Sequence, residues 1–147
     1  MAADPERLSV PDPARITIRR LVEYPDTDAS GHYQHAIVLR WVEAAEAVLH
    51  DRLGIAQRTF GSTPRLHLEI DYRMPLWFLE EVEVDLRAAH VGRTSVRWDF
   101  AVRRGDRLAA EGHFVAAHVP AAGAGSVPWP DDIRHAFLEG GDRTDAG

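Results

Sequence analysis

Hydrophobic and polar residues alternate along five stretches of the chain, a pattern typical of half-buried β-strands. The first stretch runs from Arg15 to Tyr24, and the others lie at 66–74, 82–91, 94–104 and 108–120. Short turns built around Gly92 and Gly105 separate the later stretches. Strands joined by such short turns pair antiparallel, so we expect a largely antiparallel sheet.

One stretch follows the helical period instead. From Ala36 to Gly54 the apolar residues recur every three or four positions without an intervening proline, which predicts a long helix with one wide apolar stripe. Gly54 stands where the end of a helix favours glycine. A shorter helix is predicted at DDIRHAFLEG, residues 131–140, with Asp131 or Asp132 as its N-cap. The closing GDRTDAG is expected to be disordered.

This order of elements predicts an α+β fold in which one long helix covers the apolar face of a five-stranded antiparallel sheet. We expect one domain at residues 15–120, preceded by a flexible arm at 1–14 and followed at 121–147 by a linker, a short helix and a tail. A lone sheet covered by a single helix leaves its edges open, which favours the pairing of two copies.

Composition then excludes several classes of protein. The chain has 147 residues, of which 45% are hydrophobic, and this suits one globular domain. The net charge of −6 argues against a general nucleic-acid binder, and the absence of cysteine excludes disulfides and thiolate metal sites. Neither a signal peptide nor an apolar run of about 18 residues is visible, so we expect a cytoplasmic protein without a membrane span.

The candidate chemistry lies between the first strand and the long helix, in YPDTDASGHYQHAIVLRW. Asp26 and Asp28 fall in a turn, which either can shape through hydrogen bonds to the backbone. The N–H groups at a helix start carry a partial positive charge and can stabilise a carbonyl oxygen that becomes negative during acyl transfer. A carboxylate beside them, such as Asp28, can attack the carbonyl carbon or take a proton from water. The two features make a minimal hydrolytic site.

Metal binding is the other chemistry that this segment offers. Asp28, His32 and His35 are all possible ligands, but no separate metal motif such as HExxH accompanies them. We therefore expect no metal here. Without further information, His32 suits a solvent-facing turn, His35 a helix cap, and Glu43 a solvated helix face.

The segment Tyr24-Pro25-Asp26-Thr27-Asp28-Ala29-Ser30-Gly31, then His35-Ala36 and Arg40-Trp41-Val42-Glu43-Ala44-Ala45, resembles the signature of hot-dog-fold acyl-CoA thioesterases. It is most similar to the 4-hydroxybenzoyl-CoA thioesterase-like group, and the resemblance runs from about Arg15 to Pro120. It implies hydrolysis of an acyl-CoA or acyl carrier protein thioester to the free acid and thiol, without a cofactor. It also implies a homodimer or a dimer of dimers, with sites between paired subunits.

The resemblance assigns roles within the segment. Asp28 matches the catalytic carboxylate, a nucleophile or general base, and the backbone at His35 matches the group that polarises the thioester carbonyl. Glu43 matches a helix acid that supports the active-site loop or takes part in the chemistry. The remaining expected contacts are with substrate: Gly31, His32 and Tyr33 near the acyl group, and Arg93 and Thr94 near coenzyme A, where Arg93 would meet a phosphate.

The chain departs from the pattern of the group it resembles at two places. Gly31-His32-Tyr33-Gln34-His35 mixes the patterns Gly-His-Val-Asn-His and Gly-Val-Val-Tyr-His, and Phe78-Leu79-Glu80-Glu81 replaces an aromatic-Gly-Asp run. Two other functions stay open. One is a hot-dog enoyl-thioester hydratase or dehydratase, whose usual Gly-Asp-x-Asn-Pro-x-His run is absent, and the other is a non-catalytic acyl-thioester binding protein.

Overall fold

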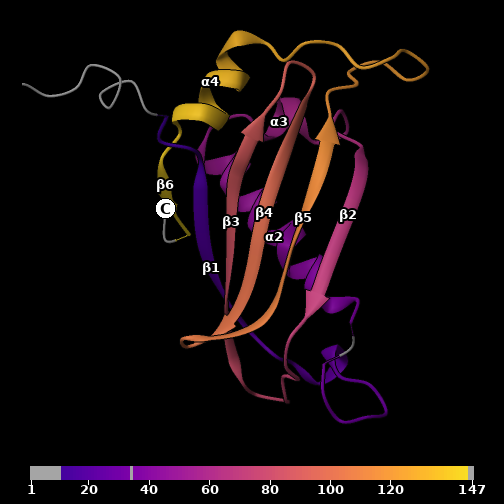
Figure 1. Ribbon diagram of the computed structural model, residues 1–147, viewed down its shortest axis with the longest axis vertical. Helices are drawn as coiled ribbons and strands as arrows, with labels where there is room; N and C mark the ends of the chain where they lie inside the picture. The colour runs from indigo at the N-terminus through magenta and orange to yellow at the C-terminus, as the bar shows by residue number, and fades with distance from the viewer. Residues whose placement is uncertain (1–10, 34, 146–147) are drawn as a thin grey trace, which may run out of the picture.

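The computed structural model describes residues 11–33 and 35–145 (Figure 1). Predictions that concern residues 1–10, 34 and 146–147, including most of the N-terminal arm, lie outside this part of the chain. The elements in chain order are β1 (Arg15–Leu21), η1 (Tyr24–Asp26), α2 (Ile37–Arg52), α3 (Ala56–Thr59), β2 (Arg65–Tyr72), β3 (Glu81–Val91), β4 (Ser95–Arg104), β5 (Arg107–Ala117), α4 (Asp131–Glu139) and β6 (Asp142–Thr144).

All the strands belong to one sheet with the order β2-β5-β4-β3-β1-β6. The pairs from β2 to β1 are antiparallel, and β6 runs parallel to β1. The long helix α2 lies against one face of this sheet (Figure 1). The predicted α+β arrangement is therefore confirmed, with six strands in place of five. None of the helices in the described residues is long and apolar enough to cross a membrane.

The extra strand corrects the prediction of a disordered tail. Residues Asp142–Thr144 pair with Arg15–Thr17, although Asp-Arg-Thr has no apolar alternation that could signal a strand. Main-chain pairing with β1 holds this segment in place. Arg52 of α2 also holds it by donating to the carbonyl oxygens of Thr144 (Nε to O, 3.1 Å) and Asp145 (Nη2 to O, 2.8 Å).

The start of α4 also differs from the sequence prediction. Its N-cap is Pro130, without a side-chain cap, so Asp131 and Asp132 lie in the first helical turn instead. There the carboxylates face the positive end of the helix dipole. Asp132 forms an ion pair with Arg58, which joins α4 to the end of α3.

The core forms where the predicted stripe of α2 meets the sheet. The stripe residues are buried, and they are Val38, Trp41, Val42, Ala45 and Leu49. The sheet contributes alternate residues from its central strands, among them Val84, Leu86, Trp98, Phe100 and Phe114. Full burial of each large side chain contributes about 1.5–3 kcal/mol to folding, so this contact is the main source of stability.

Strand β2 lacks the cover that its alternating pattern leads one to expect. Leu66 is 65% exposed, Leu68 39% and Tyr72 45%, although they alternate with polar residues. The physical reason is that β2 is the edge strand, on the far side of β5 from the sheet centre. One chain therefore leaves an apolar strip uncovered along an open edge.

One polar residue of α2, His50, is buried in the core, and its burial changes its own ionisation. His50 is 2% exposed and is surrounded by the rings of Phe60, Trp98 and Phe137. Its Nδ1 lies 2.6 Å from Thr59 Oγ1, whereas its Nε2 is buried without a partner in the described residues. Burial, together with the positive charge of Arg65, lowers the pKa of His50 from 6.5 to about 4. The imidazole is therefore neutral in the folded protein.

We expect His50 to make stability fall in mild acid. Between pH 6.5 and about 4 the unfolded chain binds a proton at this residue and the folded chain does not. The free energy of unfolding is therefore highest above pH 6.5 and decreases as pH falls through this window, by roughly 3 kcal/mol in all. Urea unfolding at several pH values measures this slope, and His50→Leu should flatten it. An equal slope in the variant would contradict the assignment.

Candidate active site

The loop between β1 and α2 is held in shape by its own polar groups. Asp26 Oδ2 accepts the N–H of Glu23 at 2.8 Å, so Asp26 shapes the turn as the sequence suggested. The N–H of Asp28 donates to His32 O at 3.1 Å, and the N–H of Gly31 donates to Asp28 O at 3.0 Å. These bonds fold residues 28–32 into a tight turn ahead of the helix.

The turn is docked on the segment that follows β2. The N–H of Tyr33 donates to Leu76 O at 2.8 Å, and His32 forms a single bridge with Trp77. Gly31 has a φ of +88°, which favours glycine, and a Cβ there would lie 3.5 Å from the Trp77 ring. The local backbone therefore explains the glycine of the motif.

Asp28 presents an ionised carboxylate in this turn. Its Oδ1 accepts the Ser30 N–H at 2.8 Å and also the Ser30 hydroxyl. These two bonds, with the nearby imidazoles of His32 and His35, lower the pKa of Asp28 below its usual range. The side chain is exposed, and it borders a hollow of about 400 Å³.

The hollow is formed by the loop and by the end of β2. Its lining consists of Asp28, His32, Tyr33, His35, Tyr72, Arg73, Met74 and Pro75. Another hollow of about 400 Å³ lies between β1, β3 and β4, away from these residues. Because only the first hollow borders the predicted carboxylate and histidines, it is the candidate active site.

Two tyrosines give the hollow an aromatic wall. The Tyr72 hydroxyl donates to the carbonyl oxygen of His35 at 2.6 Å and so ties the residues before α2 to β2. Tyr33 is 5% exposed and stacks on Trp41 of the helix at a centroid distance of 6.2 Å. Its hydroxyl has no partner among the described residues, and burial next to Tyr72 raises its pKa to about 12.

The start of α2 lies directly beside this wall. The helix begins at Ile37 with Ala36 as its N-cap, and no side chain caps it. His35 therefore comes one residue before the cap. The first-turn N–H groups that follow have no partner within the helix and carry its partial positive charge.

The predicted site residues fall into two groups. Asp28, His32, Tyr33 and His35 line one hollow, and Gly31 adjoins it. The other predicted residues lie outside that lining: Glu43 on an exposed part of α2, and Arg93 with Thr94 in the turn between β3 and β4. That turn and the loop are at opposite ends of the sheet (Figure 1), so one chain does not bring the two groups together.

Several lining residues were missed by sequence reasoning. Tyr72, Arg73 and Met74 fall at the end of the strand predicted at 66–74, and only Pro75, which follows it, indicated that the chain turns there. Ser30 was also missed, although an Asp with a Ser two residues later is typical of a side-chain-capped turn. Among the described residues, the ligand atoms of Asp28, His32 and His35 do not converge into a metal-binding group.

Comparison with known proteins assigns the chain to a family. A sequence profile described as the thioesterase-like superfamily matches residues 22–137 of this chain. The chain belongs to this superfamily. The thioester hydrolase that the sequence predicts is thus confirmed at the level of the family.

Individual relatives agree with this family. A 1,4-dihydroxy-2-naphthoyl-CoA hydrolase from Synechococcus elongatus is 32% identical over 93 residues, which cover 59% of this chain and 68% of the relative. The crystal structure of a hypothetical protein from Thermus thermophilus is 28% identical with a TM-score of 0.73, covering 82% of this chain and 95% of that one. A putative thioesterase from Pseudomonas aeruginosa is 26% identical, with the same TM-score and the same coverage.

The contact with Ser30 should control the ionisation of Asp28. Ser30→Ala removes the hydroxyl donor and leaves the main-chain donor, so the pKa of Asp28 should rise toward its ordinary value. Carbon-detected NMR of the Asp28 carboxyl measures the titration directly. Thr27→Ala is the matched control, because that hydroxyl donates to Tyr24 O and not to the carboxylate. Equal titration curves in wild type and Ser30→Ala would contradict this role.

Proposed function

We propose that this chain hydrolyses an acyl-CoA thioester in the hollow beside the start of α2. The observation that carries the proposal is the ionised Asp28 carboxylate, fixed by Ser30 at the rim of that hollow and next to an uncapped helix start. Membership of the thioesterase-like superfamily supports the reaction class.

In the proposed reaction the thioester carbonyl lies between the carboxylate and the first turn of α2. The N–H groups at the helix start stabilise the oxygen as it becomes negative. Asp28 either takes a proton from the attacking water or attacks the carbonyl carbon itself and forms an anhydride that water then cleaves. Both routes consume one water and release the free acid and the coenzyme A thiol.

We favour an aromatic acyl group as the substrate. The hollow offers the rings of Tyr33, Tyr72 and His32, and Trp77 packs edge-on against His32 at a centroid distance of 5.6 Å. Aromatic rings pack well against such walls. The relative from Synechococcus, by its name, acts on an aromatic acyl-CoA, which supports the same choice for this chain.

Replacement of Asp28 by Asn tests the central role. The amide cannot act as a base or as an effective nucleophile, so the turnover of benzoyl-CoA should fall by roughly 10²–10⁴-fold. Thiol release read with a thiol-reactive dye measures it. Asp26→Asn is the matched control, since Asp26 lies in the same loop and its carboxylate accepts the N–H of Glu23 within the turn, and it should keep near-normal turnover.

The outcomes separate the remaining functions. Full activity in Asp28→Asn would remove Asp28 from the mechanism. Saturable benzoyl-CoA binding without thiol release from the wild type would favour the non-catalytic binder. Loss of the enoyl absorbance of crotonyl-CoA without thiol release would favour the hydratase.

We also propose that two copies pair along β2. This strand has eight residues at an open edge and carries the exposed Leu66 and Leu68. At the other edge β6 has three residues, all polar and exposed. Long apolar edges are a liability in a single chain, and antiparallel pairing of two β2 strands would satisfy the main-chain groups of both.

Such pairing would also bring together the predicted site residues at the Asp28 hollow of one copy and those of the β3–β4 turn of the other. A two-fold axis across β2 inverts the second copy, so the turn with the partner subunit's Arg93 comes to the end of the sheet where Asp28 lies. The chain contains no lysine, so arginine is the cation available for the phosphates of coenzyme A. This supports a site completed by both copies.

A charge placed on β2 should prevent this pairing. Leu68→Glu puts a carboxylate on the proposed seam, and the mass in solution should fall from that of a dimer or larger assembly to the monomer value of 16.4 kDa. Light scattering after gel filtration measures the mass. Leu21→Glu is the control, because Leu21 is 41% exposed on β1 rather than on β2. A wild-type monomer would contradict the proposal.

A further inference from the structure

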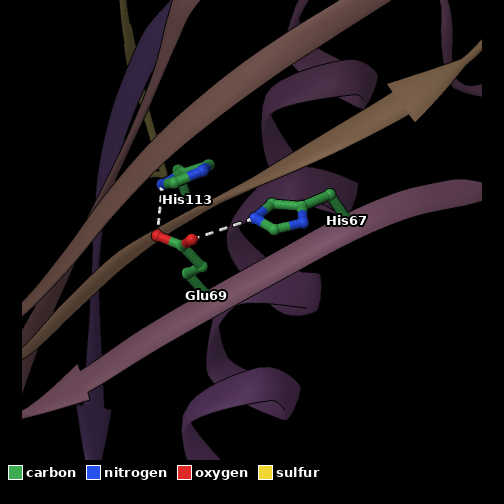
Figure 2. Close-up of side chains that lie close together, drawn as sticks. All are labelled: His67, Glu69 and His113. Atoms are coloured by element: carbon green, nitrogen blue, oxygen red, sulfur yellow. Dashed lines mark ion pairs between the residues drawn. The ribbon is translucent and has the colours of Figure 1, made fainter.

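Three potential metal ligands converge on the face of the sheet that α2 does not cover. His67 and Glu69 come from β2 and His113 comes from β5, and the three side chains point toward one another (Figure 2). His67 Nε2 lies 3.2 Å from Glu69 Oε1, and His113 Nδ1 lies 3.7 Å from Glu69 Oε2. One ligand atom from each residue lies within 4.8 Å of the others.

Strand geometry explains this convergence. Glu69 stands directly opposite His113 in the β2–β5 register, and His67 is two residues from Glu69 and therefore on the same face. Phe114, next to His113, faces the core, so His113 points outward. An irregularity in register between Arg65 and His67 lets Arg65 face α2, where it pairs with Glu46, while His67 faces outward.

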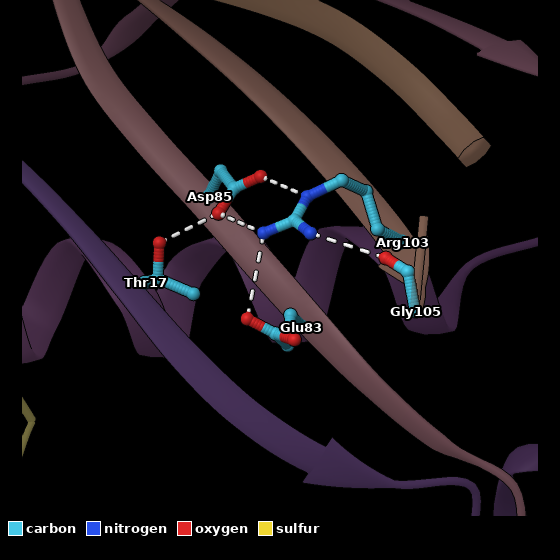
Figure 3. A network of polar contacts seen from close by, with 5 residues as sticks. All are labelled: Thr17, Glu83, Asp85, Arg103 and Gly105. Atoms are coloured by element: carbon cyan, nitrogen blue, oxygen red, sulfur yellow. Dashed lines mark hydrogen bonds and ion pairs between the residues drawn. The ribbon is translucent and has the colours of Figure 1, made fainter. Parts of the chain in front are cut away.

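Glu69 differs from the other acids on this face in its partners. Asp71 and Glu111 are paired with Arg73, and Asp99 is paired with Arg87 and Arg97. Farther along the same face Arg103 lies between Asp85 and Glu83 (Figure 3). In the described part of the chain, Glu69 forms ion-pair contacts with the two histidines alone.

We propose that His67, Glu69 and His113 bind a divalent transition metal, with Zn²⁺ as the representative ion. Two nitrogens and one carboxylate oxygen are a ligand set that zinc takes, and they leave a fourth position for water or another ligand. Two atoms bound about 2.1 Å from a tetrahedral zinc lie about 3.4 Å apart. One ligand atom of each residue already lies within 4.8 Å of the others, so side-chain rotations that draw them closer would close the site.

The proposed ion would fasten the edge strand β2 to β5. His113 has a side chain that is 18% exposed, and those of His67 and Glu69 are 50% and 61% exposed, so the ion can enter from solvent. Edge-to-edge pairing of two copies leaves the sheet faces open and does not block the site. The proposed metal site is distinct from the hollow at Asp28, which none of the three ligands lines.

Titration of Zn²⁺ into untagged, chelator-treated protein at pH 7.5 tests the site. Competition with a chromophoric chelator should give one ion per chain with micromolar affinity, and thermal melting should move up by several degrees in the presence of zinc. His67→Gln, Glu69→Gln and His113→Gln should each weaken binding at least about tenfold and reduce the thermal shift. Mg²⁺ and Ca²⁺, which prefer oxygen ligands, should give no shift.

His135→Gln is the matched control, because His135 is exposed on α4 and should leave zinc binding unchanged. Circular dichroism checks that each variant is folded, and Glu69→Gln keeps the size of the side chain. Binding of much less than one ion per chain, or equal affinity in wild type and all three ligand variants, would overturn the proposal. The cluster would then be a simple ion-pair network. Neither result depends on thioester hydrolysis, so this test is independent of the proposed reaction.

Discussion

The burial of one apolar helix stripe against one sheet face governs the architecture. A helix of 16 residues packs against the central strands, and the sheet around it has six. The helix cannot reach every strand, so β2 keeps its leucines exposed while β3 and β4 are covered. The same contact fixes the start of α2 beside the end of β2. The hollow with Asp28 forms there because the chain must turn from β1 to enter the helix.

The two faces of the sheet follow opposite electrostatic rules. On the face toward α2, polar groups are few, and burial disfavours their charged forms, as the lowered pKa of His50 shows. Glu46 is buried there too, and burial raises its pKa against the opposing effect of its ion pair with Arg65. The outer face instead carries paired acids and arginines that bridge neighbouring strands. At Asp85 burial acts to raise the pKa, but the contacts with Arg103 and Thr17 outweigh it and lower the pKa.

The sequence was sufficient for the features that depend on periodicity. The stripe of α2 and the order of the strands follow from patterns of burial that each residue carries locally. The grouping of Asp28 and His35 at one hollow was also predicted, because they belong to a recognisable motif, and their catalytic roles stay a prediction. What the sequence could not supply was the position of each strand within the sheet. The exposure of Leu66 and the separation of Arg93 from Asp28 both depend on that position.

Main-chain interactions account for the other differences. Strand β6 forms although its residues are polar, because β1 offers it unpaired N–H and carbonyl groups. Leu79 is another case, since it has a φ of +70° in the turn where Trp77 O accepts the N–H of Glu80 at 3.1 Å. A positive φ is unfavourable for a residue with a side chain, such as leucine. Such a conformation persists because the surrounding structure holds it.

The short strand β6 bears on how this protein behaves at high concentration. A sheet with two long edges of unpaired main-chain groups can add neighbours on both sides and grow into a fibre. Under the proposed pairing along β2, the other edge carries the three polar residues of β6, so edge pairing would favour one direction and would stop once two β2 strands have met. A tail with no apolar pattern would thereby limit polymerisation.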